Sequence, residues 1–147
     1  LNDGSAALLL ANESGLSSSG LTPLAQIISS AVVGVEPRIM GIGPVRASEI
    51  ALKRAGITFD DLDVIELNEA FSAQALACIR AWGLDDDDAR INPNGGGISI
   101  GHPLGVTGSR ILLAAARQLE RTGGKYGLVT LCIGVGQGYA VVIKNTQ

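Results

Sequence analysis

The stretch that decides the fold reads YGLVTLCIGVGQGYAVVI and occupies residues 126–143. It contains two apolar runs, 126–133 and 139–143, and the five residues GVGQG (134–138) separate them. Short apolar runs bounded by glycine-rich turn residues are typical of buried strands. We therefore predict two neighbouring antiparallel strands joined by a tight turn.

Outward from this hairpin, helical spacing alternates with further apolar runs, which is the pattern of a layered α/β protein. Glycine follows each predicted helix and favours its termination there. Helices are predicted from 44 to about 55, after 68 up to 82, and from 104 to about 122. Buried strands are predicted at 6–11, 24–35 and 62–67.

The segments between these elements are rich in residues that favour turns and loops. Residues 2–4 and 40–44 are predicted turns, 13–22 is a loop or a poor short helix, and the acidic run 85–88 is a solvated loop. The glycine-dense stretch 92–101 is predicted to be irregular, because glycine is unfavourable within a helix.

Composition excludes several classes of protein. The 147 residues are enough for one ordinary domain, with 46% hydrophobic residues, 17% charged residues and a net charge of −3. An acidic chain with 3% aromatic residues is a poor nucleic-acid binder, and no apolar run is long enough to span a membrane. Two cysteines and one histidine are too few for a disulfide scaffold or a zinc site. Because the sequence begins with Leu1 rather than Met, we expect a piece of something longer.

The first candidate cluster is Asn68-Glu69-Ala70-Phe71, between a predicted strand and a predicted helix. The ordinary interpretation makes Asn68 a helix N-cap and Glu69 a first-turn carboxylate, with Phe71 in the core. The functional alternative is that Asn68 orients a water molecule or a carbonyl group. The sequence pattern by itself favours the ordinary role.

The second cluster, NGGGISIGHPLG at 94–105, contains His102 directly before a predicted helix. We expect the helix dipole to keep this imidazole neutral, so that it can accept a proton from a thiol or donate to a carbonyl. A structural histidine is the alternative. The glycines do not form a dinucleotide-binding G-x-G-x-x-G motif after a strand, so that interpretation is rejected.

The third cluster is Cys132 with the glycines that follow it. A buried free cysteine is usually inert, but a thiol at a strand end can face a cleft. The backbone N–H of Gly134 could then stabilise an oxyanion. Cys78, in the middle of a predicted helix, is interpreted as core packing.

These three clusters, in this order, resemble the C-terminal half of the thiolase family. The resemblance is carried by NEAF (68–71), by GGGISIGHPLG (95–105) and by CIGVGQG (132–138). The stretches 2–4 and 37–44 also look similar, so the resemblance covers residues 1–147 as one thiolase C-terminal domain. It implies a mixed sheet with helices on both faces. The variant of the third motif looks closer to bacterial β-ketoadipyl-CoA or medium-chain thiolases.

The resemblance also implies roles for the residues. His102 activates the nucleophilic cysteine and donates to the thioester oxygen, while Asn68 holds a catalytic water. Cys132 is the acid/base at the carbon α to the carbonyl. The Gly134 N–H helps to form a second oxyanion hole, and Phe71 lines the substrate pocket. We expect the side chains at 68, 102 and 132 to converge on one point.

The implied reaction is acyl transfer between 3-ketoacyl-CoA and CoA, with CoA as substrate and with no cofactor or metal. The family's nucleophilic cysteine lies in an N-terminal half that this chain lacks, so the chain alone is expected to be inactive. Expected partners are that N-terminal domain and further copies of the chain, in the cytoplasm.

Two alternatives stay open beside the enzyme. One is a non-catalytic thiolase-like domain that binds acyl-CoA or lipid, although Asn68, His102 and Cys132 are all present. The other is a ketoacyl synthase, which shares the general fold. Those enzymes carry histidine where thiolases carry the late cysteine, so Cys132 favours a thiolase.

Overall fold

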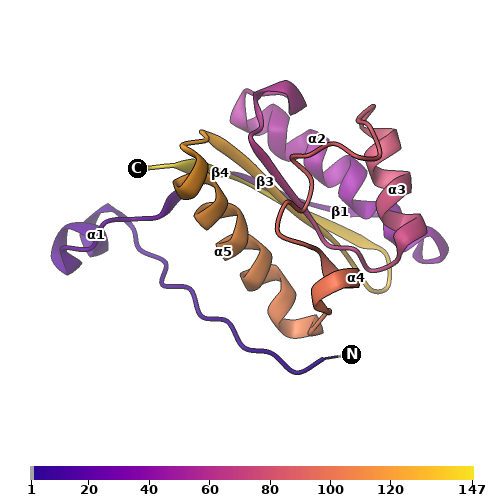
Figure 1. The fold of residues 1–147 in the computed structure, drawn as a ribbon, viewed down its shortest axis with the longest axis horizontal. Helices are drawn as coiled ribbons and strands as arrows, with labels where there is room; N and C mark the ends of the chain where they lie inside the picture. Colours follow the sequence, from indigo (N-terminus) through magenta and orange to yellow (C-terminus); the bar gives the residue numbers. More distant parts are fainter. Residues whose placement is uncertain (1) are drawn as a thin grey trace.

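The computed structural model describes residues 2–147 and contains a four-stranded sheet between two layers of helices (Figure 1). The strands follow the order β1-β4-β3-β2, where β4 is antiparallel to both β1 and β3, and β2 is parallel to β3. The predicted mixed sheet and hairpin are confirmed. The strand bounds are Ala25–Gly34 for β1, Val64–Leu67 for β2, Tyr126–Ile133 for β3 and Gln137–Asn145 for β4.

Helices cover both faces of the sheet, as expected for this fold class (Figure 1). Helix α2 (Gly43–Ala55) and helix α3 (Ser72–Ala81) lie on one face, and α5 (Leu104–Thr122) lies on the other. The predicted helix ends at Gly56 and Gly123 are confirmed, and both glycines have a φ of 71°. Only glycine adopts this left-handed conformation readily, which explains why the helices end there.

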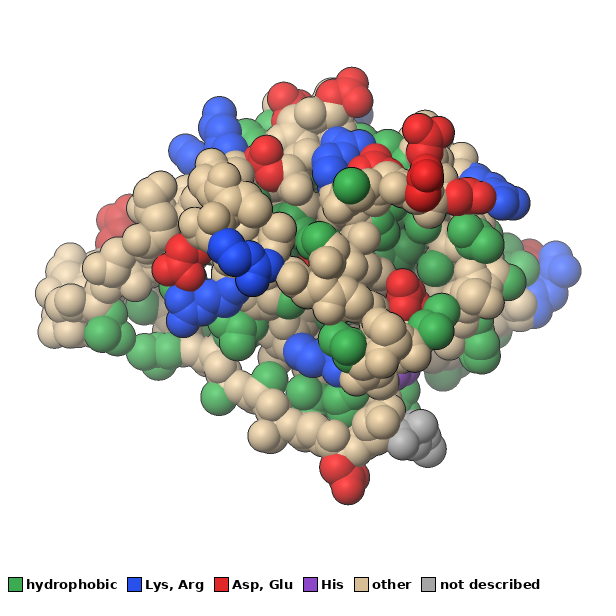
Figure 2. Space-filling view, in the orientation of Figure 1, with side chains coloured by type: hydrophobic (Ala, Val, Ile, Leu, Met, Phe, Trp, Pro, Cys, Tyr) green, Lys and Arg blue, Asp and Glu red, His purple; other side chains and the backbone are tan. Residues whose placement is uncertain are grey.

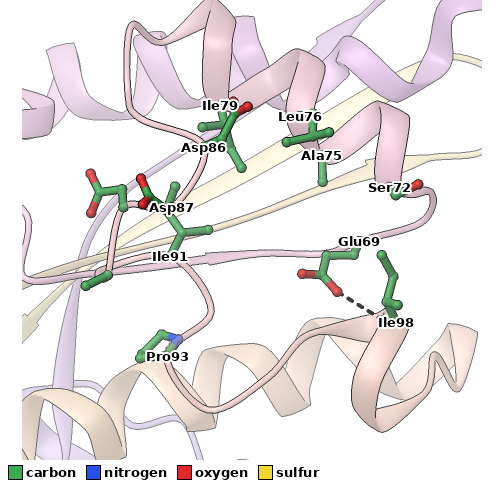
Figure 3. A pocket seen from close by; sticks show the side chains of 12 residues that line it. Glu69, Ser72, Ala75, Leu76, Ile79, Asp86, Asp87, Ile91, Pro93 and Ile98 are labelled. Carbon is green, nitrogen blue, oxygen red and sulfur yellow. Dashed lines mark hydrogen bonds between the residues drawn. The ribbon is translucent and has the colours of Figure 1, made fainter.

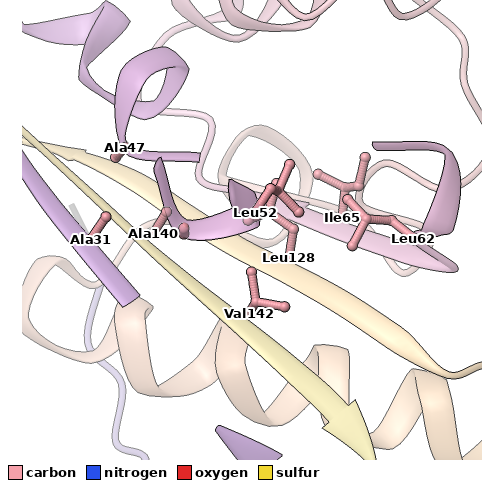
Figure 4. Close-up of a cluster of buried hydrophobic side chains, with 9 residues drawn as sticks. Ala31, Ala47, Leu52, Leu62, Ile65, Leu128, Ala140 and Val142 are labelled. Atoms are coloured by element: carbon pink, nitrogen blue, oxygen red, sulfur yellow. The ribbon is translucent and has the colours of Figure 1, made fainter. Parts of the chain in front are cut away.

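The core has one layer on each side of the sheet because successive strand residues point to opposite faces. In β3, Leu128 packs with Leu52 of α2, whereas Val129 packs with Ile111 and Leu119 of α5. Figure 4 shows the layer beneath α2, where Val142 and Ile65 join the same cluster. Burying each such side chain stabilises the fold by about 1.5–3 kcal/mol.

The start of β4 lies directly against the start of α2 through two glycines. A Cβ atom on Gly43 would lie 2.6 Å from the carbonyl oxygen of Gln137, and a Cβ atom on Gly138 would overlap the backbone of Gly43. Neither position has room for a side chain. The end of the hairpin is therefore held at a fixed place beside α2.

The prediction of a buried strand at 6–11 is wrong. This segment is an extended coil that pairs with no strand among residues 2–147, and Leu9 and Leu10 are 80% and 72% exposed. Hydrophobic side chains are visible along this segment at the lower edge of Figure 2. An apolar run predicts burial only where another element covers it, and nothing in the described residues does so here.

Three loop predictions also need correction. Residues 2–4 form no turn, and the Asn2 side chain accepts a hydrogen bond from the His102 N–H. Of the two alternatives for 13–22, the short helix is confirmed: α1 (Glu13–Ser19) begins after Asn12, which accepts a capping hydrogen bond from the Gly15 N–H. A 3₁₀ helix, Pro37–Ile42, replaces the turn at 40–44 and runs directly into α2. The glycine-rich stretch holds the single-turn helix α4 (Gly97–Ile100).

Among residues 2–147, no helix has both the length and the apolar character needed to cross a bilayer.

Candidate active site

The candidate site lies where the parallel strands β2 and β3 end. Leu67 is the register partner of Thr130, and the Asn68 N–H donates to the Thr130 carbonyl at 3.0 Å. Ligand sites in α/β proteins commonly form at the carboxyl ends of parallel strands. Asn68 directly follows β2, and Cys132 is the penultimate residue of β3. Two of the three predicted clusters therefore lie at the same edge of the sheet.

Asn68 does not cap the helix that follows it, so the ordinary interpretation from the sequence is wrong. Helix α3 begins at Ser72, and Phe71 occupies the N-cap position without a side-chain hydrogen bond. The side chain of Asn68 is instead 2% exposed, and its Nδ2 lies 3.4 Å from Nε2 of His102. Its Oδ1 is buried without a hydrogen-bond partner among the described residues.

His102 is held from several sides in the turn between α4 and α5. Its N–H donates to Asn2 Oδ1 at 3.0 Å, and its Nδ1 lies 2.7 Å from Oγ1 of Thr107. Gly101 before it has a φ of 86°, and its carbonyl accepts from Nη2 of Arg110 at 2.8 Å. The ring therefore has a defined orientation, with Nε2 toward Asn68.

Burial lowers the pKa of His102 below its ordinary value, and the positive charge of Arg110 lowers it further. A histidine with a lowered pKa is uncharged near neutral pH, as expected from the sequence. The physical cause differs from that expectation, which rested on the helix dipole. A neutral imidazole can accept a proton at whichever ring nitrogen lacks one.

Glu69 joins the first two clusters. It precedes α3 instead of lying in its first turn, so its predicted role at that helix is wrong. Its Oε2 accepts from the Ile98 N–H at 3.0 Å, which satisfies a free donor in the first turn of α4, and its Oε1 accepts from Asn92 Nδ2 at 3.0 Å. Glu69, the neighbour of Asn68, thus helps to hold α4, and the position of His102 after α4 depends on it.

Asn92 extends this arrangement along the edge of the sheet. Its Oδ1 accepts from the Leu67 N–H and its Nδ2 donates to the Leu67 carbonyl, both at 2.9 Å. The side chain thus pairs with the last residue of β2 as a neighbouring strand would. No sequence signal distinguished Asn92 from an ordinary loop residue.

A hollow adjoins Glu69 between α3 and the loop before α4 (Figure 3). Its acidic rim is largely neutralised, because Asp86 pairs with Arg80 and Asp88 pairs with Arg90. His102 and Cys132 are not among the residues that line it. In the described part of the chain, no three His, Cys, Asp or Glu residues cluster as metal ligands.

The two cysteines occupy different environments. Cys78 is fully buried, its thiol donates to the Gly41 carbonyl at 3.4 Å, and burial raises its pKa to about 11. The prediction that Cys78 packs in the core is therefore confirmed. Cys132 is 7% exposed at the strand end, and burial raises its pKa as well.

Gly134 and Phe71 are the remaining predicted site residues. Gly134 is exposed and opens the turn between β3 and β4. Phe71 is 67% exposed, so its ordinary interpretation as a core residue is wrong. Gly134 directly follows β3, Phe71 lies in the connection between β2 and α3, and both are exposed.

Glu66 is a buried charge that the sequence analysis missed, although an acidic residue within an apolar strand was a usable signal. It is 2% exposed in β2, and its Oε1 lacks a hydrogen-bond partner among the described residues. Burial raises its pKa to about 7, although the nearby charge of Arg110 opposes this shift and that of Glu69 adds to it.

The raised pKa of Glu66 predicts a stability that depends on pH. The folded carboxyl binds its proton more tightly than the unfolded one, so stability falls as the pH rises from about 4.5 through about 7. Glu66→Gln has no carboxyl to titrate, so its free energy of unfolding should not show this loss. Its stability relative to the unsubstituted chain should therefore be about 3 kcal/mol greater at pH 8 than at pH 5. Urea unfolding at both pH values measures the difference, with the exposed Glu13→Gln as control. An equal effect of Glu66→Gln at both pH values would contradict the prediction.

The fold and the site together define a layered α/β protein whose polar side chains gather at the carboxyl edge of two parallel strands. Residues 21–145 match the family model described as "Thiolase, C-terminal domain", and the chain belongs to this family.

Curated relatives and solved structures agree with this assignment. The chain is 55% identical over 145 residues to the 3-oxoadipyl-CoA/3-oxo-5,6-dehydrosuberyl-CoA thiolase of Escherichia coli, and 56% identical over the same length to a β-ketoadipyl-CoA thiolase of Acinetobacter baylyi. Each alignment covers 99% of this chain but only 36% of the relative. The crystal structure of human mitochondrial 3-ketoacyl-CoA thiolase superposes with a TM-score of 0.89 at 48% identity, covering 93% of this chain and 34% of that one.

Proposed function

We propose that this chain supplies the acid–base and oxyanion part of a thiolase active site, which transfers acyl groups between a 3-ketoacyl-CoA and CoA. The observation that carries the proposal is the contact of 3.4 Å between Asn68 Nδ2 and His102 Nε2, at the sheet edge where the strand of Cys132 ends. His102 takes a thiol proton, and Cys132 exchanges the proton at the carbon next to the thioester. The Gly134 N–H stabilises an oxyanion, and Phe71 lines the pocket.

The free Oδ1 of Asn68 supports its role in holding a catalytic water. A buried amide oxygen without a partner costs about 1–3 kcal/mol. A water that donates to this oxygen would remove the cost. Its second hydrogen would then be available to a thioester oxygen, as an oxyanion-hole donor.

The chain spans only 36% of the length of the relatives it matches, which leaves room for further active-site residues outside it. We propose that a thiolase N-terminal domain contributes the nucleophilic cysteine and most of the CoA-binding surface, and that further copies of the protein assemble with it in the cytoplasm. Apolar side chains are exposed around the site, and this supports the proposal because another domain or copy would cover them. Phe71, Ile98, Leu104 and Val135 are 67%, 63%, 63% and 85% exposed.

The substrate class follows from the relatives. The E. coli and Acinetobacter baylyi proteins are named for 3-oxoadipyl-CoA and its synonym β-ketoadipyl-CoA. A solved structure of the human mitochondrial enzyme is described as a complex with CoA. We propose a CoA thioester of a 3-oxo acid as substrate, with 3-oxoadipyl-CoA as the first compound to test.

A chimera tests the proposal, with this chain in place of the matching 145 residues of the E. coli thiolase. We expect it to cleave 3-oxoadipyl-CoA in the presence of CoA, and the consumption of the thioester measures the rate. A folded chimera that binds CoA thioesters without cleaving them would contradict the proposal. It would favour the alternative of a non-catalytic acyl-CoA-binding domain.

A further inference from the structure

We propose that Thr107 is a positioning residue that keeps a proton on Nδ1 of His102, so that Nε2 alone exchanges protons with the reacting groups. The inference rests on the proposed function and extends it to a residue that does not itself reach the substrate. Thr107 lies in the first turn of α5 and is fully buried.

The hydrogen bonds of Thr107 define the direction of its proton. The Oγ1 atom donates to the carbonyl oxygen of Pro103 at 3.1 Å and lies 2.7 Å from Nδ1 of His102. A hydroxyl group has one proton to donate and lone pairs that accept. When that proton points at Pro103, the bond to His102 must use a proton on Nδ1. The Thr107 hydroxyl therefore accepts from the imidazole.

The carbonyl of Pro103 is a fixed acceptor. It also accepts the N–H groups of Val106 at 2.9 Å and of Thr107 at 3.0 Å in the first turn of α5. A carbonyl oxygen cannot donate, so the sequence of bonds from His102 through Thr107 to Pro103 runs in one direction.

The opposite side of the ring leads to the same assignment. Nε2 faces Nδ2 of Asn68 at 3.4 Å, and an amide nitrogen donates. An Nε2 that carried its own proton would place two donors against each other. The reverse tautomer would require rotation of the Asn68 amide and loss of the hydroxyl bond to Pro103. Both ends of the imidazole therefore favour Nδ1–H with an unprotonated Nε2, whose lone pair faces the Asn68 amide.

This tautomer suits the proton transfer that the proposed function needs. The S–H bond of an attacking thiol breaks, its electron pair stays on sulfur, and the proton bonds to Nε2. The resulting imidazolium keeps its bond from Nδ1–H to Thr107, so the ring does not have to turn. Burial and the charge of Arg110 lower the pKa of His102, which keeps the ring neutral and ready to accept before the step.

Nuclear magnetic resonance of the 147-residue chain tests the tautomer directly, because His102 is its single histidine. The ¹⁵N shifts of the ring show which nitrogen carries the proton, and we expect Nδ1. Thr107→Val keeps the side-chain shape but removes the acceptor, so the population should shift toward Nε2–H, whereas Thr107→Ser should restore Nδ1–H. Protonation at Nε2 in the unsubstituted chain would overturn the proposal, and this result does not depend on whether Thr107→Val folds.

Activity of the chimera provides the second measurement. Thr107→Val should lower kcat for acyl transfer about a hundredfold, with a much smaller change in KM, because the general base is then largely in the wrong tautomer. Thr107→Ser should stay within about threefold of the parent chimera, because it keeps the hydroxyl acceptor. Thr122→Val, at the exposed end of the same helix, is the matched control and should leave the rate unchanged.

The outcomes separate the two proposals. An inactive parent chimera with an Nδ1–H tautomer in the 147-residue chain would contradict the proposed function and leave the role of Thr107 supported. A folded Thr107→Val variant with the parent tautomer and rate would overturn the role of Thr107 alone.

Discussion

Replacing Gly138 by alanine is expected to lower the free energy of unfolding by about 3 kcal/mol or more, a large part of the stability of a typical domain. The added methyl group would overlap the backbone of Gly43 at the start of α2. A backbone atom cannot rotate away as a flexible side chain can. The hairpin or the helix would have to move, and both belong to the packed core.

Urea unfolding followed by circular dichroism measures this effect. Gly34→Ala is the matched control, because Gly34 ends β1 and its added methyl group would meet nothing within 4 Å. The control should change stability by less than about 1 kcal/mol. A Gly138→Ala variant as stable as the control would show that the two glycines do not fix the hairpin against α2.

Cys132→Ser in the chimera is expected to lower the rate of thiolysis about a thousandfold. A serine hydroxyl cannot exchange a proton near neutral pH as a thiol can. Burial raises the pKa of Cys132, so the thiol form is favoured and is ready to protonate the carbanion that cleavage produces. The variant should retain exchange of labelled CoA into acyl-CoA, because that half-reaction needs only the attacking thiol with His102 and Asn68.

Cys78 provides the control for this experiment. Cys78→Ala removes a thiol that lies in the core under α3, and it should keep the rate within about threefold once folded. Equal rates for the two cysteine variants would contradict the role of Cys132. Loss of the exchange reaction together with thiolysis would place Cys132 in the acyl-transfer step instead.

Local preferences accounted for much of the fold. Periodicity and terminating glycines predicted α2 and α5, and the alternation of apolar runs with a glycine turn predicted the β3–β4 hairpin. The strand expected at 6–11 failed because an apolar run carries no information about which neighbour will cover it. The single-turn helix α4 was missed because Glu69, far away in the sequence, satisfies its first turn.

The sequence by itself determined the layered class and the three polar and glycine-rich clusters, and their resemblance pointed to the family that was then shown. Only the tertiary structure decided that Asn68 contacts His102, 34 residues away, instead of capping α3. It alone revealed the hydrogen bonds from Glu69 to Ile98 and Asn92, and the hydroxyl of Thr107 against the imidazole. The physical reason is that such contacts depend on strand register and loop path, and these are set by packing over the whole chain instead of by neighbouring residues.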